Sequence, residues 1–449
     1  MLPIVNLVLG AYLIWRYVWT LRLGVAGKAA LAALLMALIE HHWLVARVFG
    51  GTIASPEIPR AALIGVSVAY GTLATTAALL LLRDLAGLAA WLPSRAAGRA
   101  ILGNRAAPHA FLVASLVLAS IGVAQAIRVP AVKRMDVALA GLPAELDGYQ
   151  VAHLTDLHLS RLLQAPWAAA TVAATNAAGA DLIVISGDLV DGTPAARAAD
   201  VAPLAGLSAR DGVYAVAGNH EYYADYVAWM RKFDELGIAM LENRHVVIRQ
   251  GFVLAGVPDL MAARHGQRVP DTAAALAGKP AGLPVVLLDH RPANVLHNQP
   301  LGVDLQLSGH THGGHAVGLD WIIARFNRGF VSGRYAVGRG MLYVSNGAGL
   351  WPGFPIRLGR PSDITLITLR TAKPANCRPG AGNQSIRRVS APARACAPRR
   401  RASRARAPSG ALPSRLPRAT SSRKAPARSG SGPAHGVVPP AKGSLRRVP

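Results

Sequence analysis

Two patterns of apolar residues divide most of the chain. Up to about residue 127 the apolar residues form long runs, and residues 61–82 and 110–127 contain no charged side chain. Since about 20 apolar residues are needed for a helix to cross a bilayer, these runs predict transmembrane helices. Two further apolar runs, 4–21 and 29–49, are interrupted by charged or ionisable residues, and we interpret them as spans too. The pattern therefore predicts about four transmembrane helices over residues 1–127.

Two features of these N-terminal runs allow alternatives. Run 4–21 could be a signal peptide, but it lacks a charged leading segment and a clear small-residue cleavage site. Run 29–49 contains Glu40, His41 and His42, and ionisable residues at membrane depth are usually functional. Alternatively, these three residues reach the membrane interface or pack inside the helix bundle, which is the interpretation that we favour.

From about residue 130 to residue 370 the pattern is of a different kind. Short runs rich in Val, Ile and Leu alternate with Ala-rich stretches of helical character. The strand-like runs are 149–155, 181–186, 212–217, 252–257, 284–288, 303–308, 341–345 and 363–369, and the helical stretches lie near 166–178, 195–205 and 223–236. This alternation is typical of an α/β domain with buried sheets, which we place at 128–370. In such domains functional groups collect at the carboxyl ends of the strands.

Charge separates a third segment, residues 371–449. The whole chain of 449 residues has 48 Lys and Arg against 23 Asp and Glu, a net charge of +25. The third segment holds 18 of the basic residues and no acidic one, so the first 370 residues carry only +7. The high overall charge is therefore no argument that the whole protein binds nucleic acid. Because this segment is rich in Arg, Pro, Ala, Ser and Gly, we expect a disordered basic tail.

The tail allows two interpretations. It could act as a polybasic arm for anionic lipid or nucleic acid, or it could be an extension without a role, which we favour. Cys377 and Cys396 both lie in it. The rest of the chain has no cysteine, which excludes a disulfide framework, a zinc–thiolate site and a cysteine nucleophile there.

The charges between the apolar runs predict an orientation in the membrane. The connection after the third run contains Arg83, Arg95, Arg99 and Arg105 against Asp84, and the connection between the first two runs is also basic. Positively charged connections tend to stay in the cytoplasm. With four spans, both termini and the α/β domain then lie on the outer, periplasmic side of the cell membrane.

Five polar clusters each follow a strand-like run of the α/β domain. They are Asp156-Leu157-His158, Gly187-Asp188, Gly218-Asn219-His220-Glu221, Asp289-His290 and Gly309-His310-Thr311-His312-Gly313-Gly314. Residues two positions apart in an extended chain point to the same side, so an Asp-x-His or His-x-His pair can bind one cation or two adjacent cations. Carboxylate, amide and imidazole groups form a ligand set that suits Mn, Fe, Zn or a similar divalent ion. The flanking glycines allow sharp turns and a close approach of the backbone to a ligand.

In this order, the clusters DLH, GD, GNHE, H and GHTH resemble the motifs of the calcineurin-like metallophosphoesterase superfamily. The longer motifs DLHLS, GDLVD, GNHEYY and GHTHGG, together with the closing stretch 347–369, are most similar to those of the bacterial membrane-attached or exported branch of this superfamily. The resemblance covers roughly residues 148–370. It implies a four-layer α/β/β/α sandwich, preceded here by the transmembrane bundle, and the hydrolysis of phosphate mono- or diesters with two divalent metal ions.

The resemblance also implies a role for individual residues. The first ion would be bound by Asp156, His158 and His312, the second by Asn219, His290 and His310, and Asp188 would bridge the two. Such a pair of ions activates a shared hydroxide that attacks phosphorus in line. His220, next to the ligand Asn219, would be the catalytic residue that stabilises the transition state or protonates the leaving alkoxide.

Other polar residues near the motifs have more than one candidate role. Glu221 and Asp191 could orient ligand imidazoles or serve as ordinary caps and solvated groups. Arg291 and Arg357 could bind substrate phosphate, and Asp289 could perturb the neighbouring ligand site or face solvent. Three histidines without motif support are expected to be structural: His153, His297 and His315.

These observations predict a membrane-anchored dinuclear phosphoesterase. Its partners would be the bilayer and a phosphoester substrate, with lipid-linked or envelope phosphoesters as candidates, whereas nucleic acid is not an expected partner. One alternative is a UDP-2,3-diacylglucosamine-type pyrophosphate hydrolase of lipid A synthesis, which would require a site facing the cytoplasm. A second is a non-catalytic metal-binding scaffold, although no expected ligand is missing. A third is a nucleic-acid phosphodiesterase that uses the basic tail.

Overall fold

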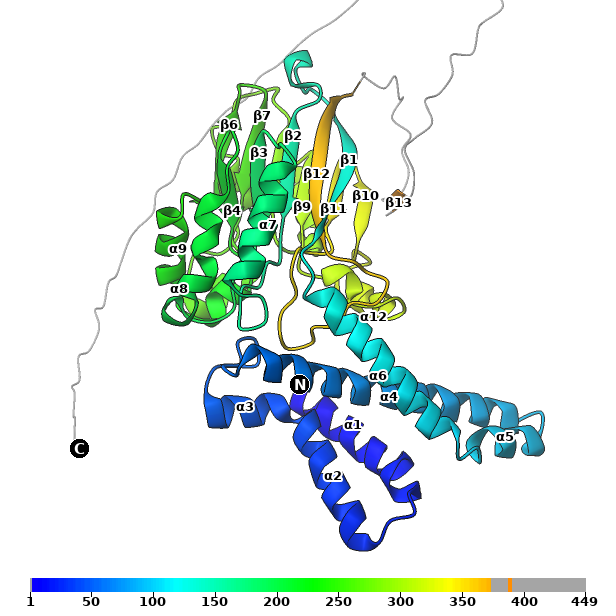
Figure 1. The fold of residues 1–449 in the computed structure, drawn as a ribbon. Coiled ribbons are helices and arrows are strands. Elements are labelled where there is room, and N and C mark those ends of the chain that lie inside the picture. Colours follow the sequence, from blue (N-terminus) through cyan, green and yellow to red (C-terminus); the bar gives the residue numbers. More distant parts are fainter. Residues whose placement is uncertain (1, 373–386, 390–449) are drawn as a thin grey trace, which may run out of the picture. The chain divides into compact units, whose positions relative to one another are not determined.

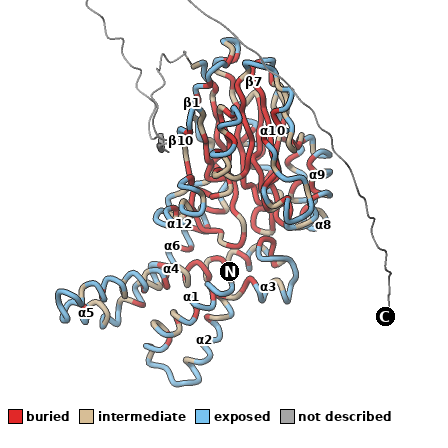
Figure 2. Tube along the Cα trace, turned by 180° about the vertical axis from the view of Figure 1, so that it is seen from behind, coloured by how far each residue is buried: buried red, intermediate tan, exposed pale blue. Residues whose placement is uncertain are grey.

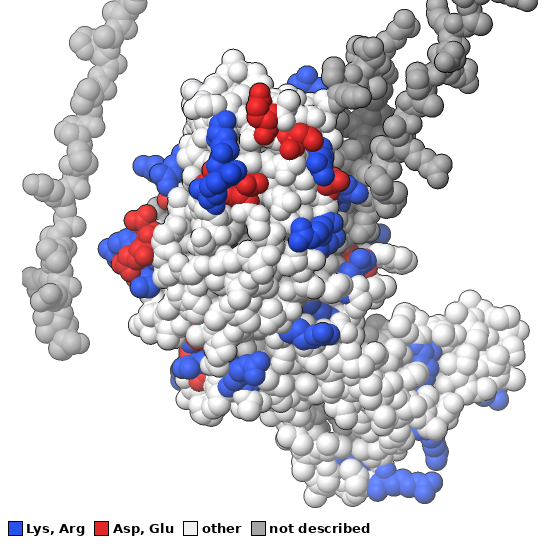
Figure 3. Space-filling view, turned by 45° about the horizontal axis from the view of Figure 1, so that its top comes forward, with Lys and Arg blue, Asp and Glu red and all other residues white. Residues whose placement is uncertain are grey.

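The computed structural model describes residues 2–372 and 387–389 (Figure 1). The first part of the chain is helical. Its helices are α1 (Leu2–Arg16), α2 (Val25–Ile39), α3 (His41–Phe49), α4 (Arg60–Trp91), α5 (Arg95–Leu102) and α6 (Ala107–Ala126). Two of those described, α4 and α6, are long and apolar enough to cross a membrane, and they pack against each other. On the face shown in Figure 3 the helical region carries few charged side chains, which indicates association with a membrane.

The predicted number of four membrane spans is not confirmed. Helix α1 has 15 residues, about 22 Å at a rise of 1.5 Å per residue, whereas the hydrocarbon core of a bilayer is about 30 Å thick. Run 29–49 forms two helices, α2 and α3, which are bent by 72° at Glu40. The described residues thus offer two full-length candidate spans, or three if the bent pair counts as one.

The histidines at this bend pack inside the helical region. His41 and His42 are 6% and 7% exposed, and the centres of their rings lie 5.2 and 5.3 Å from the ring centre of Tyr70. The hydroxyl of Tyr70 donates a hydrogen bond of 2.9 Å to Asn6 Oδ1. These contacts agree with the interpretation that the two histidines are packing residues of the bundle.

Two β-sheets form the centre of the second part of the chain. The first has the strand order β1-β12-β2-β3-β4-β5, and the second has the order β13-β10-β11-β9-β8-β7-β6. Within them, β2 to β5 are parallel to one another, as are β7, β8, β9 and β11. The strands are β1 (Ala131–Leu139), β2 (Gln150–Leu154), β3 (Leu182–Ser186), β4 (Val213–Val216), β5 (Ala239–Met240), β6 (Arg244–Ile248), β7 (Phe252–Gly256), β8 (Val285–Leu288), β9 (Leu305–Ser308), β10 (Gly333–Val337), β11 (Gly340–Val344), β12 (Asp363–Thr371) and β13 (Arg387–Val389).

Apolar side chains cover both faces of each sheet. Val151 and Leu182 of the first sheet pack with Leu254 and Leu288 of the second, and Figure 2 shows that the buried residues are concentrated in the strands. Helices cover the outer faces. They are α7 (Ala165–Ala177), α8 (Pro194–Val201) and α9 (Tyr226–Glu235) on the first sheet, and the short α10 (Thr272–Ala275) and α11 (Val295–Asn298) on the second. The predicted α/β class with four α/β/β/α layers is confirmed.

The strands that the sequence analysis predicted are all present, as β2, β3, β4, β7, β8, β9, β11 and β12. Four strands before the tail were not predicted: β1, β5, β6 and β10. Strand β5 has only two residues, and exposed or half-exposed polar residues interrupt the apolar pattern of the other three; β1, for example, contains Lys133, Arg134 and Asp136. Strand β13 lies in the predicted tail and pairs with β10. Apart from it, the tail beyond residue 372 lies outside the described residues.

Candidate metal centre

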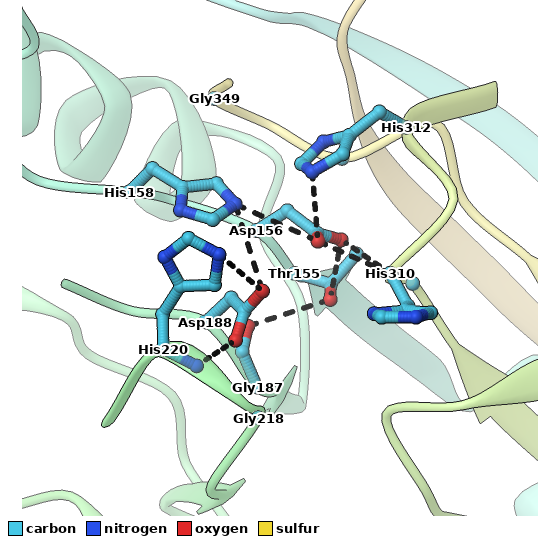
Figure 4. A network of polar contacts seen from close by, with 12 residues as sticks. Thr155, Asp156, His158, Gly187, Asp188, Gly218, His220, His310, His312 and Gly349 are labelled. Carbon is cyan, nitrogen blue, oxygen red and sulfur yellow. Dashed lines mark hydrogen bonds and ion pairs between the residues drawn. The ribbon is translucent and has the colours of Figure 1, made fainter. Parts of the chain in front are cut away.

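The polar clusters meet at one edge of the two sheets. Asp156, Asp188 and Asn219 follow β2, β3 and β4 of the first sheet, while His290 and His310 follow β8 and β9 of the second. Because neighbouring parallel strands end at the same edge of a sheet, the loops that follow them lie together. Figure 4 shows the side chains of these loops pointing toward one another.

Asp156, His158 and His312 form one group of candidate ligands. Their ligand atoms all lie within 4.8 Å of one another, and the three side chains are at most 5% exposed. Nε2 of His158 lies 3.8 Å and Nε2 of His312 lies 3.6 Å from Asp156 Oδ1. Two ligands bound at about 2.1 Å in tetrahedral geometry would be about 3.4 Å apart. The spacing therefore suits one cation among the three side chains.

Asp188, His290 and His310 form a second group. Nε2 of His290 lies 3.1 Å from Asp188 Oδ2 and 3.3 Å from Nδ1 of His310. The same carboxylate oxygen, Asp188 Oδ2, is 3.7 Å from His158 Nε2 of the first group. Asp188 thus lies between the two groups, which is the arrangement required of a carboxylate that contacts two adjacent cations.

Three buried atoms of the candidate ligands have no hydrogen-bond partner among the described residues: His158 Nε2, His312 Nδ1 and Asn219 Oδ1. An unpartnered buried polar atom costs about 1–3 kcal/mol, so a folded protein normally supplies a partner. An imidazole nitrogen and an amide oxygen are both ligands of divalent cations. The donor set and its unpartnered atoms therefore fit a pair of divalent ions.

The charge states of Asp188, His310 and His312 also suit cation binding. Burial lowers the pKa of His310 to about 3 and the pKa of His312 well below its ordinary value, so both rings are neutral and able to coordinate. Burial alone would raise the pKa of Asp188, but the imidazoles of His290 and His220 outweigh it and hold that pKa well below its ordinary value. Burial would lower the pKa of His290, yet Asp188 outweighs it and raises the pKa to about 10. A cation that binds His290 must therefore displace a proton.

The backbone of the centre is strained. Asp156, His158, Asp188, His310 and His312 have φ angles of 53°, 47°, 55°, 68° and 50°. Non-glycine residues avoid this left-handed region unless their surroundings impose it, and such residues gather at functional sites. The strain therefore supports a functional role for the same residues that the motifs indicate.

Two glycines allow the backbone to approach the carboxylates closely. A Cβ atom on Gly309 would lie 2.1 Å from Asp156 Oδ2, and a Cβ atom on Gly218 would lie 2.2 Å from Asp188 Oδ1. Real Cβ atoms do not approach other atoms so closely. Only glycine is therefore compatible with the observed positions of both carboxylates.

His220 lies beside the centre and is held by Asp191. Its backbone N–H donates to Asp188 Oδ1 at 2.8 Å, and its Nε2 lies 3.9 Å from Asp188 Oδ2. Its Nδ1 contacts Asp191 Oδ1, and Asp191 Oδ2 lies 3.2 Å from Nδ1 of His158. Asp191 thus orients two imidazoles at once, which was one of its two expected roles.

Glu221 accepts hydrogen bonds from backbone N–H groups. Its Oε1 accepts from the N–H groups of Leu189 and Val190 at 2.7 and 3.3 Å, and its Oε2 accepts from those of Asp188 and Gly218 at 3.1 and 2.7 Å. Of the two roles expected for Glu221, these contacts agree with capping of backbone N–H groups and not with orienting a ligand imidazole. Its buried carboxylate instead joins the loop after β3 to the loop after β4.

The structure does not support phosphate binding by the two candidate arginines. Nε and Nη2 of Arg291 donate to the carboxylate of Asp259 at 2.6 and 3.0 Å. Arg357 is fully buried, and its Nη2 donates to the carbonyl oxygens of Asn346 and Gly349, both at 2.7 Å. Both guanidinium groups are engaged inside the protein, and Arg357 holds the closing loop in place.

The remaining predicted residues have local roles. Asp289 does not face solvent, since it is 2% exposed, and it accepts hydrogen bonds from Asn294 at 3.0 Å and Asn298 at 2.8 Å. His153 is buried and its Nε2 lies 2.8 Å from Ser186 Oγ. Two other histidines lie outside the two ligand groups: His297, which is exposed, and His315, which is 8% exposed.

A cavity of about 620 Å³ lies beside His220, and part of its wall was not predicted from the sequence. Three wall residues come from the connection between α3 and α4, and the others come from the α/β domain. The lining residues are Thr52, Ile53, Ala54, His220, Tyr223, His265 and Trp351. The helical region therefore contributes directly to the surroundings of the centre.

Polar contacts fix this connection on the α/β domain. The hydroxyl of Ser55 donates to the carbonyl oxygen of Asp191 at 3.2 Å. Glu57 forms ion pairs with Arg197 and with Arg161, the latter at 2.8 Å. One sequence signal could have revealed the contact, because Glu57 is the only acidic residue between residues 41 and 83. An isolated carboxylate in an apolar region needs a partner, and here it lies on another part of the fold.

Comparison with known proteins agrees with this geometry. A family model described as calcineurin-like phosphoesterase matches residues 149–314. The chain is 32% identical over 267 residues to an uncharacterised metallophosphoesterase of Campylobacter jejuni, covering 58% of this chain and 69% of that protein. It is 33% identical over 274 residues to a transmembrane protein with metallophosphoesterase domain of Danio rerio, covering 58% and 62%. With the Bos taurus protein of the same name the identity is 32% over 306 residues, covering 64% and 68%.

Proposed function

Since this chain belongs to the calcineurin-like metallophosphoesterases and is a metal-dependent phosphoesterase, we propose that it hydrolyses phosphate mono- or diesters at a pair of divalent ions. The first ion would be bound by Asp156, His158 and His312, the second by Asn219, His290 and His310, with Asp188 bridging. One observation carries the proposal: ligand-type side chains from five separate loops converge, and His158 Nε2 and Asn219 Oδ1 are buried there without a hydrogen-bond partner in the described part of the chain.

Divalent ions such as Mn, Fe or Zn, when bound, lower the pKa of water and neutralise charge on phosphoryl oxygens. The chain's own residues position the groups and move the proton. Asp191 holds His220 through Nδ1, so that Nε2 remains to stabilise the transition state or to protonate the leaving alkoxide, a contribution of about 10²–10⁴-fold. Glu221 keeps the loop that carries Asp188 in register with the loop that carries Asn219.

The test uses the full-length protein, stripped with a chelator and reloaded with Mn, Fe, Co or Zn. We expect hydrolysis of p-nitrophenyl phosphate or bis(p-nitrophenyl) phosphate and two metal ions per chain by elemental analysis. Asp188→Asn should lower both the activity and the metal content. The matched control Asp234→Asn, at an exposed position of α9, should change neither. Absence of activity with every metal would contradict the proposal and favour the non-catalytic scaffold.

The cavity beside His220 supports a lipid-linked phosphoester as substrate. Its walls include the apolar side chains of Ile53, Ala54 and Trp351, directly next to the ionic centre. Such a cavity suits an amphipathic molecule, whose phosphoryl group would lie at the centre and whose apolar arm would lie on these side chains. Ile53→Asp should lower the hydrolysis of a phospholipid in vesicles much more than that of p-nitrophenyl phosphate. Equal losses for both substrates would contradict this assignment.

The hairpin of α4 and α6 supports an outer, periplasmic position of the α/β domain in a two- or multi-pass arrangement. Residues 83–106, which include α5 at the far end of the hairpin, hold four Arg and one Asp. Basic connections tend to stay in the cytoplasm, and the α/β domain follows the opposite end of α6. This orientation argues against a UDP-2,3-diacylglucosamine-type substrate, which requires a cytoplasmic site. A topology reporter fused to the C-terminus tests it, and a cytoplasmic signal would refute it.

A further inference from the structure

An apolar face is exposed to solvent on helix α12 (Leu319–Phe326). It includes Val317, two residues before the helix begins. Phe326 is 81% exposed, Trp321 79%, Val317 70% and Ile322 55%. Within the described part of the α/β domain these are the four most exposed large apolar side chains. Contiguous apolar patches on soluble domains are rare and mark sites of interaction with proteins, ligands or membranes.

The opposite side of α12 is firmly attached to the α/β domain. Asp320 is 5% exposed, forms an ion pair with Arg360 and accepts from the N–H group of Gly318 at 2.8 Å. Its Cα lies only 2.5 Å from the position of a Cβ atom on Gly314, two residues after His312. The exposed face therefore belongs to an anchored helix that packs directly on the loop of the metal centre.

The charge on the exposed face has one sign. Arg325 and Arg328 are both exposed. Residues 317–329 contain a single acidic residue, Asp320, and that carboxylate is buried and paired. The face thus combines aromatic and aliphatic side chains with two exposed cationic groups, which is the composition of helices that lie in a membrane interface.

Helix α12 is also close to the candidate span α6. The N–H group of Arg357 donates to the carbonyl oxygen of Gly122 at 3.0 Å, four residues before α6 ends at Ala126. The N–H group of the next residue, Leu358, donates to His315, and Val317 donates to Leu358, both at 3.0 Å. One short segment thus connects the end of α6 with the start of α12, and Figure 1 shows the two helices side by side.

We propose that α12 lies in the surface of the same bilayer that α4 and α6 cross. Trp321, Ile322 and Phe326 would enter the boundary between headgroups and acyl chains, where aromatic side chains are favoured. Arg325 and Arg328 would reach anionic headgroups. Because α12 packs on the loop that carries His312, this contact fixes the orientation of the metal centre toward the membrane surface. The inference does not depend on the substrate or on catalysis.

The test measures the depth of spin labels on the full chain in vesicles that contain anionic lipid. In a background with Cys377→Ser and Cys396→Ser, Trp321→Cys or Phe326→Cys carries the label, and Val227→Cys on α9, 49% exposed, is the control. At the two α12 positions we expect oxygen to relax the spin label more strongly than a water-soluble nickel chelate does. At the control position we expect the nickel chelate to relax the label more strongly than oxygen does. Nickel accessibility equal to that of the control would overturn the proposal. Spin–spin broadening at α12 would also overturn it, since a second copy would then cover the face.

A second measurement removes the face itself. Trp321→Glu combined with Phe326→Glu leaves no cavity, because both side chains are already in solvent. With a spin label on Val317→Cys, the double variant should show several-fold higher accessibility of the label to the nickel chelate. Its metal-dependent hydrolysis of p-nitrophenyl phosphate should stay unchanged, which would show that the fold is intact. Arg325→Gln should have a smaller effect that disappears in vesicles without anionic lipid. Unchanged accessibility in the active double variant would overturn the proposal.

Discussion

The carboxylate of Glu221 offers a sharp test of how the centre is held together. Each of its oxygens accepts two backbone N–H groups, at distances between 2.7 and 3.3 Å, and the side chain is fully buried. In Glu221→Gln one oxygen becomes an NH₂ group, so two backbone donors face another donor. A buried unpaired donor costs about 1–3 kcal/mol. We therefore expect the substitution to lower the free energy of unfolding by about 2–6 kcal/mol.

Thermal unfolding of the full-length protein in detergent, followed by tryptophan fluorescence, measures this loss. For a domain of this size 1 kcal/mol corresponds to about 2–4 °C, so the expected fall in Tm is roughly 4–24 °C. The matched control is Glu235→Gln on α9. Its side chain is 64% exposed and forms only a surface pair with Lys232 at 3.0 Å, which is worth about 0–1 kcal/mol.

The difference in Tm between the two variants shows whether the backbone N–H groups depend on the Glu221 carboxylate. If Glu221→Gln melted at the same temperature as Glu235→Gln, the four N–H groups would not depend on the carboxylate, and the reasoning would be refuted. The loop that carries Asp188 should also loosen, so the variant should bind less metal by elemental analysis. A large fall in Tm with unchanged metal content would mean that Glu221 stabilises the fold without positioning the ligands.

Three further changes probe the centre. Gly309→Ala should abolish metal binding and activity, because the new Cβ would lie 2.1 Å from Asp156 Oδ2. Elemental analysis measures the bound metal, and Gly206→Ala is the control, since its Cβ would lie at an ordinary distance of 3.4 Å from Val172 Cγ1. Asp191→Asn should lower kcat about 10–100-fold, since it weakens the contact with His220, and an unchanged kcat for p-nitrophenyl phosphate would contradict the orienting role. A chelator should abolish activity and added Mn or Zn should restore it, so activity in excess chelator would exclude metal dependence.

The fold class and the candidate ligands could be predicted because both are encoded locally. Buried parallel strands require short runs of Val, Ile and Leu, and those runs survive in the structure as β2, β3, β4, β8 and β9. The polar motifs follow these runs directly along the chain. Since β2, β3 and β4 are neighbouring parallel strands, their ends bring Asp156, Asp188 and Asn219 together without further information.

The number of membrane spans could not be predicted in the same way. Hydropathy reports the composition of a run but not whether its helix continues. Run 29–49 bends by 72° at Glu40, and run 4–21 becomes a helix of only 15 residues. Conversely, α4 continues through Arg83 and Asp84 to Trp91. There Asp84 forms ion pairs with Arg16 of α1 at 2.6 Å and with Arg83 at 2.9 Å.

By itself the sequence determined the α/β class, the edge of the sheets at which chemistry occurs and the type of ligands there, because these follow from periodicity and from residues that are neighbours along the chain. Only the tertiary structure decided that Glu221 accepts from backbone N–H groups and that Arg357 is buried. It also decided that Ser55 contacts Asp191, 136 positions away in the sequence, and that Trp321 of α12 is exposed to solvent. Each of these outcomes depends on which distant segment lies opposite a given side chain. That partner is fixed by the packing of the whole chain and leaves no mark in the local pattern.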